Sequence, residues 1–146
     1  RHPEQPHSEQ SDALFHRPLE PGIYGLSNAS LDTAWPKTLR LKQALADALA
    51  NESCMEVSLV TALADRSTPP LTVLPSTGVP AEAERALASP FVDMADRGYG
   101  TRSSLLLGVQ RRGASFSADL TEWTHAPSAT GPHTWTNTPP RRLRLD

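Results

Sequence analysis

The chain has 146 residues, a formal net charge of -2 and one cysteine. This length fits one domain, or a large part of one, and excludes a multidomain protein. The balanced charge argues against a dedicated nucleic-acid binder, and a single cysteine excludes a disulfide-stapled scaffold and a thiolate metal cluster. With 14 prolines and 38% hydrophobic residues, part of the chain is predicted to lie in loops or to be unfolded.

The sequence contains no signal for a membrane or for export. No apolar run approaches the roughly 20 residues that cross a bilayer, and the first ten residues lack the apolar centre of a signal peptide. We therefore expect a soluble, cytoplasmic protein without stable membrane insertion. Because the chain begins with Arg1 rather than Met, we expect a processed chain or a fragment.

The first third of the chain passes from a polar segment to a helix. Residues 1–20 carry histidines and prolines without a period, which predicts a flexible lead-in. The β-branched and aromatic residues of Gly22 to Ser27 favour a short strand that ends in a polar turn. From Pro36, leucines and alanines recur at helical spacing, so a helix is predicted to start there.

Two more helices are predicted in the middle of the chain. Ser53 to Glu56 form a capping box, which predicts a second helix running to about Ala64. The prolines of residues 65–80 exclude a regular element and indicate a loop or linker. A third helix is expected from Ala81 to about Ser89, because prolines flank it on both sides.

The last third of the chain favours a hairpin followed by a tail. Tyr99 to Gln110 is predicted to be a strand, and its continuous leucine run indicates burial on both faces. Residues 111–113 are expected to turn the chain, and Ala114 to Glu122 to return as the hairpin partner. Residues 124–146 are rich in proline and threonine, and we expect disorder there. Together these elements indicate an α/β (α+β) protein.

Two strings of residues carry a family resemblance. The first is G-L-S-N-A-S-L-D-T-A-W-P-K at Gly25 to Lys37, and the second is Y-G-T-R-S at Tyr99 to Ser103. Together they resemble the NRDE family, also called the transport and Golgi organisation protein 2 family. Leu74 and Pro75, and the residues 87–92, fall where that family has an L-P-x-T-G stretch and an L-S-S-x-F-V stretch. The first string is long enough to be specific, whereas Y-G-T-R-S alone would be weak.

The resemblance implies a fold and a missing partner. The family is similar to the N-terminal-nucleophile hydrolases, which are four-layer αββα proteins. In these hydrolases the first residue attacks an amide and its own α-amine serves as the base. Family members carry a Met-Cys start and an Asn-Arg-Asp-Glu signature in a first half that this sequence lacks. We therefore expect residues 21–123 to be the C-terminal part of such a domain, inactive and marginally folded without its N-terminal half.

Asn28 and Arg102 are the candidate catalytic residues. Asn28 follows the predicted strand where related hydrolases direct an amide at the developing oxyanion, although an Asx turn explains it equally well. Arg102 can hold a thiolate or a substrate carboxylate bidentately, and its alternative is a salt bridge to a carboxylate such as Asp32. If both serve one site, their side chains should approach within about 10 Å across one pocket.

Five further residues of the two strings are candidate substrate-binding residues: Ser27, Asp32, Trp35, Lys37 and Thr101. Structural interpretations compete with this one, because Asp32 suits a turn cap and Trp35 suits packing under the helix start. Lys37 can hold an anionic group, but a lone lysine in a first helical turn is usually solvated.

Cysteine and histidine add little. Cys54 lacks a free amine beside it, so we expect an ordinary packing cysteine, although a helix N-terminus can activate a thiol. The spacing of His2, His7 and His16 does not suit a metal site, and His125 and His133 indicate no function. No cofactor or metal is expected. The tail cluster Arg141, Arg142 and Arg144 is expected to be solvated.

Two functions from different classes remain open, and the residues do not decide whether the intact protein is an enzyme. The resemblance implies an amide-bond hydrolase of the N-terminal-nucleophile type whose nucleophile lies upstream. It also allows a non-catalytic role in haem or lipid handling and membrane-traffic homeostasis. The expected partners are a small amide or lipid-like substrate, haem in the second case, and the missing N-terminal half of the domain.

Overall fold

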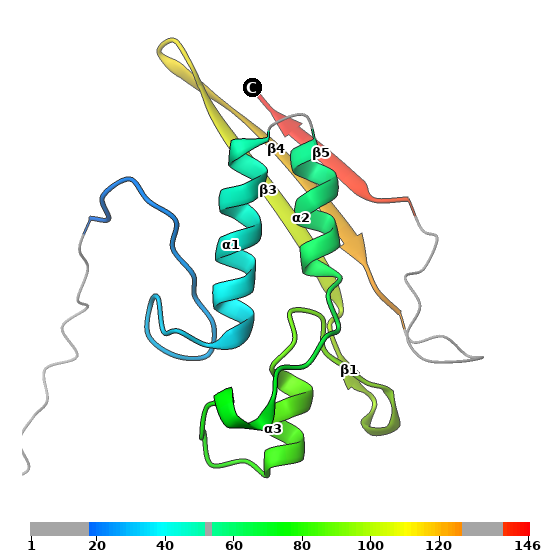
Figure 1. Ribbon diagram of the computed structural model, residues 1–146. Coiled ribbons are helices and arrows are strands. Elements are labelled where there is room, and N and C mark those ends of the chain that lie inside the picture. Colours follow the sequence, from blue (N-terminus) through cyan, green and yellow to red (C-terminus); the bar gives the residue numbers. More distant parts are fainter. Residues whose placement is uncertain (1–17, 52–53, 127–138) are drawn as a thin grey trace, which may run out of the picture.

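The computed structural model describes residues 18–51, 54–126 and 139–146 (Figure 1). It has mixed helices and antiparallel strands, which confirms the α/β (α+β) class. In chain order the elements are α1 (Pro36–Ala50), α2 (Met55–Leu63), the 3-10 turn η2 (Leu71–Val73), α3 (Ala81–Leu87), β1 (Asp93–Met94), the 3-10 turn η3 (Ala95–Arg97), β2 (Tyr99–Gly100), β3 (Ser103–Arg112), β4 (Ser115–Thr124) and β5 (Arg141–Leu145).

Helices α1 and α2 lie side by side (Figure 1). Pro36 is the first residue of α1, where its missing N–H costs no hydrogen bond. Ala48, near the end of the same helix, is buried. Helix α2 begins at Met55 with Cys54 as its N-cap, so both predicted helices are confirmed. Ser53 of the predicted capping box lies outside the described residues. The Glu56 carboxylate, its expected partner, instead forms an ion pair with Arg142 at 2.8 Å.

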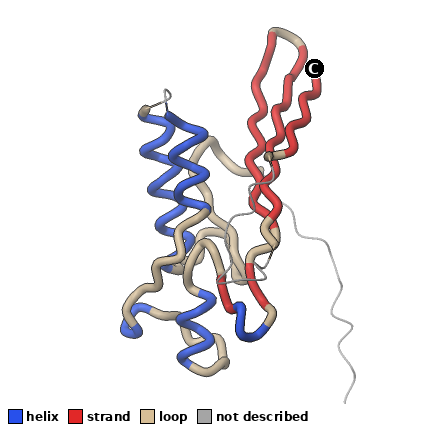
Figure 2. The backbone as a smooth tube through the Cα atoms, turned by 90° about the vertical axis from the view of Figure 1, so that its right-hand side faces the viewer, coloured by secondary structure: helices blue, strands red, loops and turns tan. Residues whose placement is uncertain are grey.

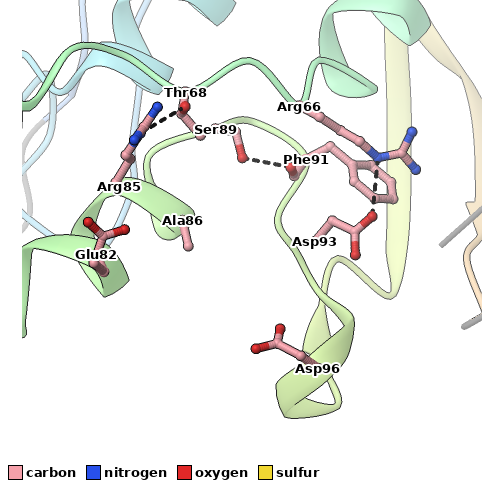
Figure 3. Close-up of a pocket in the computed structure, with 9 residues that line it drawn as sticks. All are labelled: Arg66, Thr68, Glu82, Arg85, Ala86, Ser89, Phe91, Asp93 and Asp96. Carbon is pink, nitrogen blue, oxygen red and sulfur yellow. Dashed lines mark hydrogen bonds and ion pairs between the residues drawn. The ribbon is translucent and has the colours of Figure 1, made fainter. Parts of the chain in front are cut away.

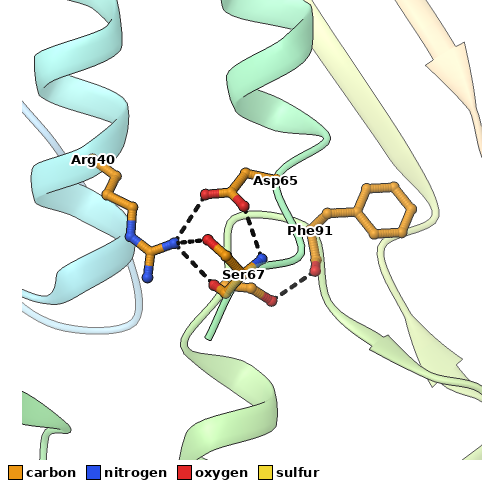
Figure 4. Close-up of polar contacts among 5 residues, drawn as sticks. Arg40, Asp65, Ser67 and Phe91 are labelled. Carbon is orange, nitrogen blue, oxygen red and sulfur yellow. Dashed lines mark hydrogen bonds and ion pairs between the residues drawn. The ribbon is translucent and has the colours of Figure 1, made fainter. Parts of the chain in front are cut away.

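The segment after α2 is tied to α1 by a polar cluster (Figure 4). Arg40 donates to the Asp65 carboxylate and to the Ser67 carbonyl, each at 2.9 Å. Burial raises the pKa of Asp65, but hydrogen bonds from Ser67 and Arg40 outweigh it and the net shift is downward. The Asp65 carbonyl also accepts the backbone N–H of Phe91 at 2.9 Å. These bonds hold the start of the predicted loop over residues 65–80. The exclusion of a regular element was wrong at residues 71–73, where the short 3-10 helix η2 forms.

The region around Tyr99 differs from the prediction. Instead of one strand from Tyr99 to Gln110, β2 pairs with the short strand β1, and β3 begins after a break at residues 101–102. Gly98 adopts φ 61° before β2, a conformation that glycine accepts at little cost. At Gly100 a Cβ would lie 2.9 Å from the Val92 carbonyl, so glycine also permits the close approach of β1 and β2.

Strands β3, β4 and β5 form one antiparallel sheet in that order. Arg112 pairs with Ser115, so the hairpin turn is Gly113 and Ala114 rather than residues 111–113, with Gly113 at φ 64°. Residues Ala118 to Glu122 of β4 pair with β5. The expectation of disorder is therefore wrong at residues 141–145, because a short Arg/Leu alternation there completes the sheet; residues 127–138 lie outside the described part.

The two faces of this sheet differ in chemistry. Residues paired directly across antiparallel strands share a face, so the register assigns the alternate side chains. One face, here called the apolar face, carries Leu105, Leu107, Val109, Phe116, Ala118, Leu120, Leu143 and Leu145, together with Ser103, Arg111, Glu122, Thr124 and Arg141 near its edges. The other, the polar face, carries Ser104, Leu106, Gly108, Gln110, Arg112, Ser115, Ser117, Asp119, Thr121, Trp123, Arg142 and Arg144.

The helices lie on the side of the polar face and cover part of it, because Ser104 and Ser117 are buried whereas Asp119, Arg142 and Arg144 are exposed. Figure 2 shows α1 and α2 on one side of the sheet, and the Arg142 to Glu56 ion pair joins that face to α2. Ser104 is 7% exposed, whereas Leu107 and Phe116 on the apolar face are 60% and 64% exposed. Burial of the leucine run on both faces was therefore a wrong expectation, because only the face toward the helices is covered by described residues.

The predicted strand Gly22 to Ser27 is absent. The backbone N–H of Asp32 donates to the Gly25 carbonyl at 2.7 Å, and Asp32 Oδ1 accepts the Gly25 N–H at 2.8 Å. These bonds close a loop over residues 25–32, with Asp32 at φ 60°, a conformation that aspartate tolerates better than most residues. Strand composition was misleading here, because no described strand lies beside the segment to pair with it.

Candidate functional site

The 25–32 loop is docked against α1 through a glycine. A Cβ at Gly25 would lie 2.3 Å from Thr38 Cγ2, so only glycine allows this approach to the helix. Lys42, one turn further along α1, donates to Asp32 Oδ1 at 2.7 Å. This bond, followed by the one from the Gly25 N–H, lowers the pKa of Asp32. The turn-cap interpretation of Asp32 is thus confirmed, and its ionic partner is Lys42 rather than Arg102.

A cavity of about 270 Å³ lies where this loop, the start of α1 and the inner face of α3 meet. We call it the α1–α3 cavity. Its lining consists of Asn28, Trp35, Pro36, Lys37, Pro75, Thr77, Glu84, Leu87, Ala88, Val92 and Tyr99. Three of the predicted site residues therefore line one cavity: Asn28, Trp35 and Lys37.

Lys37 is held inside this cavity rather than solvated. Its Nζ donates to the Leu87 carbonyl at 3.2 Å and lies 5.6 Å from the centroid of the Trp35 ring. Burial lowers the pKa of Lys37, and the negative charge of Glu84 offsets part of this effect. The interpretation of Lys37 as a solvated surface lysine is wrong.

Glu84 is a cavity residue that sequence reasoning missed. It lies on α3, is only 7% exposed, and its Oε1 accepts the backbone N–H of Thr77 at 2.7 Å and the Thr77 hydroxyl. A glutamate in a short helix is usually solvated, which is why it was overlooked. Its spacing from Leu87 and Ala88 was the available signal, because positions three and four apart share a helical face.

The remaining predicted residues lie elsewhere. Ser27 lines a neighbouring depression of about 380 Å³, which Lys37 also borders. Thr101 Oγ1 accepts the Val92 N–H at 2.9 Å, so this side chain holds the base of the β1–β2 hairpin. Arg102 is exposed, and it is not among the residues that line the α1–α3 cavity.

At one end of the sheet lies a buried polar pair, to which the sequence analysis assigned no function. Ser104 Oγ and His125 Nε2 are 3.0 Å apart, both residues are buried, and the His125 ring packs edge-on against Phe91 with centroids 5.0 Å apart. Burial, with a smaller effect from the Arg66 charge, lowers the pKa of His125. This pair fixes the end of β4 against β3, and neither residue lines one of the cavities described here.

A larger and more open depression of about 660 Å³ lies beside Phe91 (Figure 3). Both arginines of its lining already have partners within the protein. Arg66 pairs with Asp93 at 3.6 Å and stacks over the Phe91 ring at 4.3 Å, and Arg85 donates to Thr68 at 3.3 Å. None of the predicted site residues lines it, so we assign the candidate site to the smaller α1–α3 cavity.

Cysteine and metal chemistry lie outside this cavity. Cys54 is exposed at the start of α2, so the expectation of a packing cysteine is wrong. Within the described ranges, no group of three or more His, Cys, Asp or Glu side chains could hold a metal ion. None of the helices in that part of the chain is long and apolar enough to cross a bilayer.

The fold and the site together define an α+β protein with a helix pair on one face of an antiparallel sheet and a small mixed-charge cavity beside it. The model of the Transport and Golgi organisation 2 family matches residues 5–124. The chain belongs to this family, as the two strings of residues indicated. No curated protein and no solved structure matches it.

Proposed function

We propose that this chain forms the substrate-binding part of an amide-bond hydrolase of the N-terminal-nucleophile type, in which the nucleophile comes from chain outside these 146 residues. The observation that carries the proposal is the α1–α3 cavity, where a loop and two helices gather Asn28, Lys37 and Glu84 beside two aromatic rings. Such a cavity offers hydrogen-bond donors and an acceptor on apolar walls, which is what an amide group needs.

Asn28 is the proposed oxyanion donor. When a nucleophile attacks an amide carbonyl, negative charge develops on the oxygen, and a neutral amide N–H can stabilise it without carrying a charge itself. Asn28 is exposed and lies in a loop whose ends are tied by the hydrogen bonds between Gly25 and Asp32, which keeps the loop beside the cavity. Arg102 is proposed to hold a thiolate or carboxylate from its position just before β3.

The two-faced sheet supports the layered arrangement of such a hydrolase. In a four-layer αββα protein each sheet has helices on one face and a second sheet on the other. Here the helices lie on the side of the polar face, and most apolar side chains of the other face are exposed among the described residues. We propose that a second sheet, from the missing N-terminal half of the domain, packs on the apolar face, since sheets stack through such side chains.

Steady-state kinetics of the full-length protein on a panel of acyl p-nitroanilides tests the hydrolase proposal. Asn28→Ala should lower kcat by about 10²–10³-fold if Asn28 donates to the oxyanion. Asn51→Ala, at an exposed asparagine after α1, is the matched control and should leave kcat unchanged. If Asn28→Ala keeps full activity, or if no amide is cleaved, the non-catalytic role in haem or lipid handling becomes the better proposal.

A further inference from the structure

The α1–α3 cavity contains one positive and one negative side chain, and both are at least partly shielded from bulk water. Glu84 is buried, and Lys37 is half-buried beside it, close enough for the carboxylate to affect the lysine's titration. An isolated charge in such a place is costly, and an opposite charge in the same cavity offsets part of that cost. The cavity as it stands is therefore close to electrically neutral.

This neutrality limits which ligand the cavity can accept. A carboxylate entering the cavity would be attracted by Lys37 but repelled by the Glu84 carboxylate. A protonated amine would be attracted by Glu84 but repelled by Lys37. Either ion would lose its hydration and leave one of the two protein charges overcompensated. A neutral ligand disturbs the pair least.

Hydrogen-bonding capacity then selects among neutral ligands. The Lys37 ammonium has three N–H donors, of which one is used by the Leu87 carbonyl. Both Thr77 bonds to Glu84 use Oε1, and a carboxylate has capacity for further donors at its other oxygen. A carboxamide presents a carbonyl acceptor and an N–H donor on one planar group, so it suits both residues at once.

The walls of the cavity favour a flat apolar substituent on that amide. They include the Trp35 and Tyr99 rings together with Pro75, Leu87 and Val92. Aromatic and aliphatic side chains of this kind usually supply the contact area of small-ligand sites, while a few polar groups fix orientation.

We infer that the α1–α3 cavity selects uncharged carboxamides with a planar apolar group over carboxylates and amines of the same shape, with Lys37 and Glu84 as the specificity-determining pair. The inference deepens the proposed function and rests on it in taking this cavity as the amide site. Its binding test does not depend on catalysis.

Three probes of nearly equal shape test it at pH 7: benzamide, which is neutral, benzoate, which is anionic, and benzylamine, which is cationic. Titration into the protein, followed by the fluorescence of its tryptophans and by calorimetry, gives a Kd for each. Benzamide should bind at least 10-fold more tightly than either ion. If benzoate or benzylamine binds as tightly as benzamide, or if none of the three binds, the inference is overturned.

Two substitutions should move the preference in opposite directions. Lys37→Met leaves Glu84 as the single charge of the cavity and should favour benzylamine. Glu84→Gln leaves Lys37 as the single charge and should favour benzoate. In each case the Kd of the favoured probe should fall about 10-fold or more relative to the unchanged protein. Gln keeps a carbonyl oxygen as acceptor for Thr77, which helps this variant to fold. Glu82→Gln, on the same helix but in the open depression of Figure 3, is the matched control and should change nothing.

The outcomes separate this inference from the proposed function. If the probes bind in the expected order but the full-length protein cleaves no amide, the ligand class stands and the hydrolase proposal fails. If amides are cleaved but the charged probes bind as well as benzamide, the hydrolase proposal stands and the ligand class fails. Because the order of the three probes in the unchanged protein decides the inference, an unfolded variant does not obscure it.

Discussion

The two faces of the β3-β4-β5 sheet differ in a way that reverses the usual arrangement. In most proteins that cover one face of an antiparallel sheet with helices, the apolar side chains point toward the helices. Here Ser104 and Ser117 are buried on the helix side, while Leu107 and Phe116 are exposed on the other. Exposed apolar side chains gathered on one face are typical of an interaction surface, which is the basis for the proposal that a second sheet packs here.

The comparison also explains how little of the chain is fully buried. Among the described residues, the buried hydrophobic side chains are Ala48, Ala88 and Phe91. Much of the order instead comes from polar contacts between distant segments, such as those of Arg40 with Asp65 and Ser67. The apolar face holds side chains that would each contribute about 1.5–3 kcal/mol if they were fully buried.

The largest expected effect comes from shortening a side chain on the apolar face. If this face is covered in the full-length protein, Leu107→Ala should lower the free energy of unfolding by about 2–5 kcal/mol, because it would leave a cavity. Val57→Ala on α2 is the matched control, since Val57 is 71% exposed and should change stability by less than about 0.5 kcal/mol. Urea unfolding of the two variants measures both values, and equal small effects would mean that the apolar face stays open.

A smaller effect is expected from filling the contact between the 25–32 loop and α1. Gly25→Ala forces a Cβ to within 2.3 Å of Thr38 and should destabilise the protein by about 1–3 kcal/mol as the loop moves. Gly108→Ala on the polar face meets no atom within 4 Å and should be nearly neutral. Thermal unfolding compares the two variants. If Gly25→Ala is equally neutral, the loop that carries Asn28 is not docked as described.

The buried histidine on the helix side of the sheet should give a modest pH dependence. Burial and the Arg66 charge lower the pKa of His125 in the folded state, so the unfolded chain binds more protons near pH 6.5 and below. The free energy of unfolding should therefore be highest above about pH 6.5 and should fall as the pH drops below that value. Unfolding curves from pH 8 to 5 measure this slope. The slope should flatten in His125→Gln, and an unchanged slope in that variant would assign it to other groups.

Local periodicity predicted much of the fold. Helices α1, α2 and α3 and the β3–β4 hairpin follow from apolar spacing and from prolines at element boundaries. The predictions failed where strand pairing or burial depends on segments that are distant in the sequence. A leucine run does not tell which of its members a neighbouring layer covers, and the strand composition of residues 22–27 does not supply a partner strand. The Arg/Leu alternation of β5 was hidden behind a proline-rich segment.

The candidate site could be predicted only in part. The first string of residues led to Asn28, Trp35 and Lys37, because all three lie in one short stretch of the chain that ends in the first turn of α1. Glu84 could not be found this way, since its burial depends on how α3 packs against the start of α1. The convergence of Arg102 with Asn28 remains a prediction, because it depends on how the sheet and the loop are completed.

Hydroxyl-radical footprinting of the full-length protein tests the central claim most directly, because mass spectrometry reads the oxidation of individual side chains without any substitution. If a second sheet covers the apolar face, Leu107 and Phe116 should be oxidised much more slowly than Val57, although all three are more than half exposed in the described chain. Oxidation of Leu107 and Phe116 at the rate expected for exposed side chains, relative to Val57, would contradict the account.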